Sequence, residues 1–225
     1  MTNPFLTNSK LIPLAIALTI GLTGCPSTSP PANSSPVSSD PATSRTPSPQ
    51  DHGMMGHSMD LGPADAEFDL RFIDAMTPHH QGALEMAQDV LEKSRRPELK
   101  KLAQDIMAAQ NPEIQQMQKW RTAWYPKAPK APIAWHGAMN HSMPMSQEQI
   151  HGMKMTMDLG KADAQFDLRF LNAMIVHHEG AVTMAQEVLK KSKRPEMQKL
   201  AKAIVGSQTN EIELMKTWRK RWYSQ

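Results

Sequence analysis

The stretch that decides the fold is "FDLRFIDAMTPHHQGALEMAQDVL" at residues 68–91. Its apolar side chains recur at steps of three and four residues, which places them on one face of an α-helix. The residues of this face are Phe68, Phe72, Met76, His79, Ala83, Met86 and Val90. The stretch therefore predicts a long amphipathic helix, which "SRRP" ends near residue 94.

A second amphipathic helix follows at once. It begins around Pro97, because proline is tolerated in the first turn of a helix. Its buried face is predicted to hold Leu99, Leu102, Ile106, Gln110, Ile114, Met117, Trp120 and Trp124, and Pro126 closes the unit. No segment alternates with period two, so strands are not expected.

The same pair of helices is written again at an offset of 98 residues. "MDLGPADAEFDLRF" at 59–72 returns as "MDLGKADAQFDLRF" at 157–170, and the helical stretch returns as "FDLRFLNAMIVHHEGAVTMAQEVL" at 166–189. A gapless match over this length predicts an internal duplication of a helical hairpin. The second copy predicts buried faces with Phe166, Phe170, Met174, His177, Ala181, Met184, Val188, Leu200, Ile204, Gln208, Ile212, Met215, Trp218 and Trp222.

Each predicted helix is about 30 residues, or about 45 Å, long. One hairpin of such helices has a single apolar face and nothing to cover it. Two hairpins bury each other, so the sequence predicts an all-α four-helix bundle whose halves are joined by a long crossover. The alternative is two separate hairpin domains that each pair with another chain.

The N-terminal 51 residues are set apart from these helices. Residues 1–25 have the apolar run of an export signal, and their end, "LTGC", resembles a lipobox whose Cys25 carries a lipid. An ordinary export signal with a spectator cysteine is the alternative. Residues 26–51 are rich in Pro and Ser and predict a disordered tether. Either interpretation predicts a periplasmic or extracellular protein, with membrane attachment only through a lipid at Cys25.

The remaining chain divides into three parts. Residues 52–125 and 158–225 hold the two hairpins, and residues 126–157 form the crossover. The net charge of +3 is small, and the basic residues gather where helices end, in agreement with a role in complementing helix dipoles. Export and the lack of a continuous basic stripe disfavour nucleic-acid binding.

Methionine is unusually frequent, with 18 Met against 5 Phe and 2 Tyr. For Met107 and Met197, in helical stripes, packing in the core is the simpler interpretation. The surplus lies with histidine in the polar segments that flank the helices. In the lead-in these residues are His52, Met54, Met55, His57 and Met59, and in the crossover they are His136, Met139, His141, Met143, Met145, His151, Met153, Met155 and Met157.

A polar segment containing Pro and Gly offers no core for a methionine to fill. Exposed thioethers are then wasted apolar area and an oxidation risk, unless they bind something. Thioether sulfur and imidazole nitrogen suit Cu(I), whereas carboxylates suit harder ions. The flanking segments therefore predict copper binding, as Cu(I) rather than Cu(II), with silver as a mimic.

The two His-His pairs, His79-His80 and His177-His178, allow two interpretations. Adjacent helical residues point about 100° apart, so one pair does not easily chelate one metal. The histidines are either hydrogen-bonded core residues or ligands that several helices project inward, together with Met76, Met86, Met174 and Met184.

Signs of an enzyme are missing from the sequence. Within the four predicted long helices, no Glu is followed three residues later by His, as a ferritin-like di-iron centre needs. His177-His178-Glu179 is only a weak hint of zinc hydrolysis. The expectation is a non-enzymatic metal-binding protein.

Two stretches of each copy resemble the domain-of-unknown-function family 305. In the second copy they are "FLNAMIVHHEGAVTMAQEVL" and "QTNEIELMKTW", and in the first copy they are "FIDAMTPHHQGALEMAQDVL" and "QNPEIQQMQKW". The resemblance covers residues 59–125 and 157–223. It implies a ferritin-like bundle and a role in copper resistance through Cu(I) binding outside the cytoplasm. The motif carries over onto Met76, His79, His80, Met86 and Met117, and in the second copy onto Met174, His177, His178, Met184 and Met215.

The resulting hypothesis is a copper-binding protein that lowers free copper or passes it on, with a copper sensor or efflux component as a candidate partner. Two alternatives remain open. One is a ferritin-like oxidase that turns over Cu(I) or iron. The other is an adaptor lipoprotein whose Met-rich surface binds a protein partner.

Overall fold

The computed structural model describes residues 60–225. Several predictions fall outside the described residues: the export signal, the lipobox at Cys25, the tether, and the lead-in residues His52, Met54, Met55, His57 and Met59. In the part that is described, no helix is long and apolar enough to cross a membrane.

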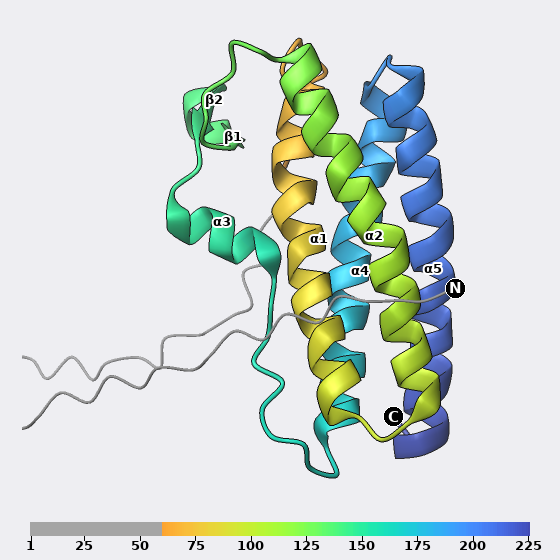
Figure 1. Ribbon diagram of the computed structural model, residues 1–225. Coiled ribbons are helices and arrows are strands. Elements are labelled where there is room, and N and C mark those ends of the chain that lie inside the picture. Colours follow the sequence, from red (N-terminus) through yellow and green to blue (C-terminus); the bar gives the residue numbers. More distant parts are fainter. Residues whose placement is uncertain (1–59) are drawn as a thin grey trace, which may run out of the picture. The chain divides into compact units, whose positions relative to one another are not determined.

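The described chain is mostly helical, as the periodicity predicts. Four long helices lie side by side (Figure 1): α1 (Phe68–Lys93), α2 (Pro97–Trp124), α4 (Phe166–Lys191) and α5 (Pro195–Tyr223). α1 packs on α2, α4 packs on α5, and α1 also contacts α4. The chain thus forms two helical hairpins that pack against each other through their apolar faces.

The helix ends recur at the same offset of 98 residues as the sequence. α2 and α5 both begin with a proline, at Pro97 and Pro195. α1 and α4 both end where a serine, Ser94 or Ser192, turns out of the helix while its N–H still bonds the carbonyl four residues earlier. Proline beyond each serine prevents the helix from continuing, so equivalent residues end equivalent helices.

The crossover differs from the prediction that it contains no strands. It holds β1 (Ile133–His136), a single 3₁₀ turn at Gly137–Met139, β2 (His141–Pro144) and the short helix α3 (Gln147–Lys154). The two strands pair antiparallel, in the register Ile133↔Pro144, and Asn140 supplies the left-handed turn conformation. Four-residue strands are too short to give a periodic signal in the sequence.

The crossover is fixed to α1 at two buried charges, of which Asp74 is the first. Its carboxylate accepts hydrogen bonds from Arg121 Nε at 2.5 Å and from the Ile133 N–H at 2.8 Å. Asp74 therefore joins α1, α2 and β1. In the second hairpin Asn172 takes this position, is exposed, and accepts one bond from Arg219 at 3.0 Å.

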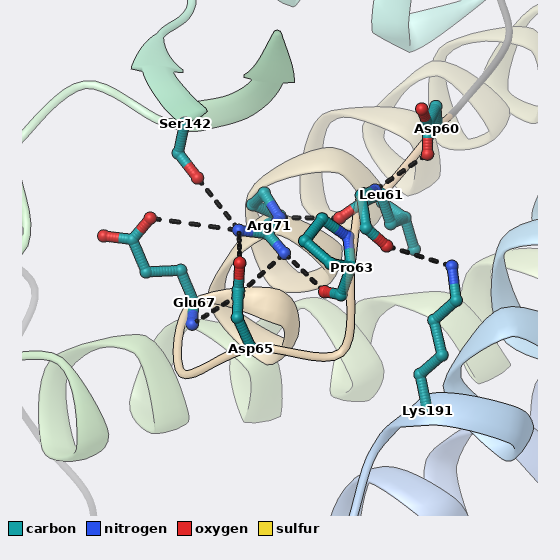
Figure 2. Close-up of polar contacts among 9 residues, drawn as sticks. Asp60, Leu61, Pro63, Asp65, Glu67, Arg71, Ser142 and Lys191 are labelled. Carbon is teal, nitrogen blue, oxygen red and sulfur yellow. Dashed lines mark hydrogen bonds and ion pairs between the residues drawn. The ribbon is translucent and has the colours of Figure 1, made fainter. Parts of the chain in front are cut away.

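The second anchor is Arg71, which is 1% exposed (Figure 2). Its guanidinium donates to the carbonyls of Leu61 at 2.6 Å and Pro63 at 2.8 Å, and it pairs with Asp65 at 2.8 Å. It also donates to the Ser142 hydroxyl of β2 at 2.9 Å. A buried guanidinium is stable only when its donors are satisfied, so this residue fixes both the loop before α1 and the strand β2.

The apolar core is divided into two clusters, each built from both hairpins. The first core cluster joins the C-terminal half of α1 and the N-terminal half of α2 to the N-terminal half of α4 and the C-terminal half of α5. The second core cluster joins the opposite halves, together with Leu61 of the loop before α1 and Met145 of the crossover. Neither hairpin completes a core without the other.

Candidate metal centre

A layer of buried polar residues lies between the two core clusters, and we call it the polar layer. Along each long helix its members fall after the residues of one cluster and before those of the other. All six are at most 3% exposed. They are His79, His80, Gln110, His177, His178 and Gln208.

Two of these histidines are bound by glutamates of the neighbouring helix. His80 Nε2 lies 2.8 Å from Glu113 of α2, and His178 Nε2 lies 2.6 Å from Glu211 of α5. An ionised carboxylate only accepts, so each Nε2 carries the proton. The Nδ1 of each ring is buried, and no hydrogen-bond partner meets it among the described residues.

The rings of the other two histidines lie against each other, tilted by 45°. The ring centroids of His79 and His177 are 3.8 Å apart. His177 Nε2 donates to the Lys154 carbonyl, at the end of α3, at 3.0 Å. In the described part of the chain neither ring nitrogen of His79 has a partner, and His177 Nδ1 has none either.

Burial keeps the central pair uncharged. The loss of water around His177, reinforced by His178, lowers its pKa to about 3. Burial, with His177 and His80 next to it, also holds the pKa of His79 well below its usual value. Neutral imidazole is the form that binds metal ions, so both rings are in a state that can act as a ligand.

Buried polar atoms without partners are rare in proteins, and a concentration of them calls for an explanation. The polar layer holds seven: five histidine nitrogens and the side-chain oxygens of Gln110 and Gln208. A carboxylate on the far nitrogen, as at His80 and His178, is also the arrangement that orients a histidine toward a metal and raises its basicity. Within residues 60–225, however, no group of three or more His, Cys, Asp or Glu side chains is arranged to hold a metal ion. The helical histidines thus stay predicted ligands.

A comparison with protein families identifies the family of this chain. The model of the domain of unknown function DUF305 matches residues 69–219, which is more than half of the chain. The chain belongs to the DUF305 family. The match begins in the first turn of α1 and ends near the C-terminus of α5, so it spans both hairpins and the crossover.

Among solved structures, this DUF305 chain is similar to CopM. It is 44% identical to CopM in the Cu(II)-bound form, with a TM-score of 0.55, over 69% of this chain and 97% of that one. For CopM in the Cu(I)-bound form the values are 36% and 0.53, over 69% and 97%. A DUF305 fragment from Deinococcus radiodurans is 32% identical with a TM-score of 0.51, over 71% of this chain and 99% of the fragment.

A curated viral protein also matches part of this DUF305 chain. It is an uncharacterised protein of Acanthamoeba polyphaga mimivirus, 43% identical over 49 residues. The match covers 22% of this chain and 32% of the viral protein, so the chain spans about a third of that relative.

The six methionines that the DUF305 motif singles out are all buried in the two core clusters. Met86, Met174 and Met215 belong to the first core cluster, and Met76, Met117 and Met184 to the second. Apolar packing accounts for each of them, because methionine fills irregular gaps in cores. Their role as ligands stays a prediction.

The Met and His residues of the crossover differ in burial. Met145 is 5% exposed and belongs to the second core cluster, and Met153 packs against that cluster. The argument that a crossover methionine has no core to fill is wrong for these two, because β1, β2 and α3 bring their own small core onto α1. Met155 is half-buried, and the remaining predicted ligands are exposed: His136, Met139, His141, Met143, His151 and Met157.

Sequence reasoning missed the two glutamates of the polar layer. It placed Gln110 and Gln208 on apolar faces and gave Glu113 and Glu211 no role. The signal was present, because in each hairpin the glutamate stands 33 residues after the histidine, His80 or His178. Only the folded hairpin shows that this separation brings the side chains of neighbouring helices together.

Proposed function

We propose that this DUF305 protein binds copper, as Cu(I), without catalysing a reaction. The observation that carries the proposal is its likeness to CopM, solved in Cu(II)-, Cu(I)- and silver-bound forms, over almost the whole length of CopM. The donor types support it. Thioethers and neutral imidazoles favour Cu(I) and Ag(I) over Mg²⁺, Ca²⁺ or Mn²⁺.

The proposal places this binding outside the cytoplasm. This location is based on the export signal predicted in residues 1–25, with or without a lipid on Cys25. In an oxidising compartment a methionine-based site avoids the disulfide chemistry that would consume cysteine thiols. The protein would contribute to copper resistance or copper trafficking by lowering free Cu(I) or by handing it to a sensor or efflux component.

We also propose that the four long helices form a ferritin-like four-helix bundle that arose by duplication of one hairpin. The recurrence of helix ends at Pro97 and Pro195, and the two reciprocal core clusters, support this origin. Duplication also explains why a histidine-glutamate pair occurs once in each hairpin.

The test is an anaerobic titration of the purified full chain with Cu(I) against a competing chelator. We expect at least one equivalent to be retained, and retention of less than one contradicts the proposal. Zn²⁺ and Mg²⁺ titrated alongside should bind more weakly. Dioxygen consumption in the presence of Cu(I) should match that of a protein-free control, because a binding protein does not turn over.

Two variants locate the copper. One replaces His79 and His177 with Leu, which keeps the layer filled with side chains of similar size. The other replaces the exposed Met139 and Met143 with Leu. Far-UV circular dichroism confirms that both variants keep their helices. If the first variant loses its tightest equivalent, the polar layer is the site, and if only the second does, the exposed methionines of the β1–β2 hairpin are; if neither does, other residues of the chain hold the copper.

A further inference from the structure

A surface pocket of about 380 Å³ lies where the end of the crossover crosses α1. Three of the residues that line it carry soft donors: Met86 of α1, His151 of α3, and Met157, which follows α3. In the sequence these residues belong to two different groups, the helical stripe and the Met/His-rich crossover. The fold brings them to one pocket.

The pocket is shaped by a close contact between α3 and α1. α3 ends on Gly82, where the Lys154 carbonyl fills the space that any Cβ would need. The Lys154 ammonium pairs with Glu85 at 2.5 Å, one turn further along α1. Met155 then adopts a left-handed conformation, with φ at 48°. After this turn the chain passes Glu85, Met86 and Asp89 of α1, and Met157 lines the pocket.

Packing does not account for the residues of the pocket rim. Met157 is 56% exposed, although a methionine without a ligand gains nothing from water contact. His151 is exposed as well, and its ring makes no hydrogen bond within the described residues. Met86 is different, since it is 2% exposed and belongs to the first core cluster. The pocket therefore leads from two exposed donors at the surface to one donor that the fold holds rigid.

Charge around the pocket favours a cation. Glu85, Asp89 and Asp158 line it, and two of them are matched by lysines, Glu85 by Lys154 and Asp89 by Lys93. Asp158 forms no ion pair in the described chain, and its Oδ1 accepts the Gly160 N–H. The carboxylates are not arranged with His151 as a three-ligand group for a metal, so a hard divalent ion is not the ligand that the site fits.

We propose that Met86, His151 and Met157 form a binding site for one soft monovalent cation, Cu(I) or Ag(I), at the junction of α1 and the crossover. The proposal rests on the copper binding proposed above. It adds the place of binding, where the metal would join the crossover to α1. One imidazole and two thioethers supply the donor set, and Asp158 supplies the negative charge that attracts the ion.

The test uses the full chain labelled with ¹³C at the methionine methyl groups and titrated anaerobically with Ag(I), then with Cu(I). Met→Leu variants at Met86 and Met157 assign the two resonances, since this substitution conserves volume. We expect both resonances to shift together and to saturate at one equivalent. In His151→Ala the same shifts should need at least tenfold more free metal.

A matched control separates this site from the rest of the crossover. His136→Ala removes an exposed histidine at the end of β1, away from the pocket, and should leave the Met86 and Met157 responses unchanged. If other methionines shift at the first equivalent while Met86 stays still, the pocket is not the site, although copper binding by the protein stands. If no methionine shifts, and a competing chelator keeps all the Cu(I) in the titration described under Proposed function, the proposed function fails as well.

Discussion

The central residues of this molecule are four histidines placed where an apolar side chain would be expected. His79 and His177 lie in contact at the middle of the helices, and desolvation keeps both neutral. A core built for stability alone would fill this position with leucine, because each buried imidazole brings polar atoms that need partners. The histidine nitrogens that lack partners are in keeping with the metal binding proposed above.

These neutral histidines predict that the metal-free protein loses stability in acid. The folded pKa of His177 is about 3, far below the ordinary value near 6.5, so between these values only the unfolded chain takes up the proton. The stabilising contribution is thus complete above about pH 6.5 and falls as the pH drops. We expect a slope of about 1.4 kcal/mol per pH unit from each of His79 and His177.

Urea unfolding of the metal-free protein at pH 7.5, 6.0 and 5.0 measures this slope. His177→Leu serves as the control and should reduce the slope, because it removes one of the two groups. A free energy of unfolding that is constant between pH 7.5 and 5.0 would contradict the neutral buried pair.

The buried contacts of Asp74 predict that substitutions at equivalent positions of the two hairpins have unequal effects on stability. Asp74→Asn weakens the bonds to Arg121 and to the Ile133 N–H in a buried place, so we expect a loss of about 2 kcal/mol. The reverse substitution at the equivalent position, Asn172→Asp, lies on an exposed part of α4 and should alter stability by less than about 1 kcal/mol. Urea midpoints of the two variants check both values, and equal losses would contradict the anchoring role of Asp74.

At this scale the sequence predicts residue classes better than residue partners. The stripe of Phe72, Met76 and Val90 follows from helical periodicity, and all three are buried. That His80 would pair with Glu113, or that Asp74 would bind β1, does not follow, because these partners lie 33 and 59 residues away. Periodicity describes one helix at a time, whereas such contacts depend on how two elements are aligned.

Among the elements, α3 depends on a single glycine of α1. Gly82 has no Cβ, so the Lys154 carbonyl can come into contact with the helix backbone while it also accepts a hydrogen bond from His177 Nε2. Gly206 in α5 is the natural comparison, since nothing lies within 4 Å of the Cβ that an alanine there would add. Both glycines are inside helices, where glycine itself costs stability.

We therefore expect Gly82→Ala and Gly206→Ala to have opposite effects. Gly82→Ala forces the end of α3 away from α1 and should lower stability by about 1–3 kcal/mol, as overpacking does. Gly206→Ala should raise stability by about 0.5–1 kcal/mol through helix propensity alone. Thermal unfolding measures both, and limited proteolysis should cut the crossover faster only in Gly82→Ala. Stabilisation by both changes would show that the contact with Lys154 is not needed.

The elements also show where sequence reasoning works. The ends of α1, α2, α4 and α5 were predictable, because helices of 26 to 29 residues repeat their period many times and prolines mark their boundaries. The crossover was not predicted, because four-residue strands are too short to show a period and the capping box of Ser146 and Gln149, which begins the eight-residue α3, was overlooked.

For the whole molecule, the two hairpins depend on each other. Arg96, before α2, pairs with Asp167 of α4 and lies over Trp222, while Arg194, before α5, pairs with Asp69 of α1 and lies over Trp124. These partly exposed pairs contribute little stability individually. The two core clusters contribute more, because each draws its side chains from both hairpins.

This organisation predicts that the protein folds without metal. Fully buried residues such as Phe72, Phe170 and Ile204 close the core on either side of the polar layer, so no ion is needed to hold the helices together. This differs from a zinc finger, whose fold depends on its metal. After treatment with a Cu(I) chelator, we expect the far-UV circular dichroism to keep its helical signal.

Metal should then raise the stability of the folded protein only by binding to it, without being needed for folding. A ligand that binds the folded state alone stabilises it by about 2.7 kcal/mol when its free concentration is 100 times its Kd. The melting temperature should therefore rise gradually with Cu(I) above the value of the metal-free protein, and the cooperative transition should be present at both ends of the titration. A chelated protein with little helix, which gains it only as Cu(I) is added, would show instead that the polar layer is unstable until a metal fills it.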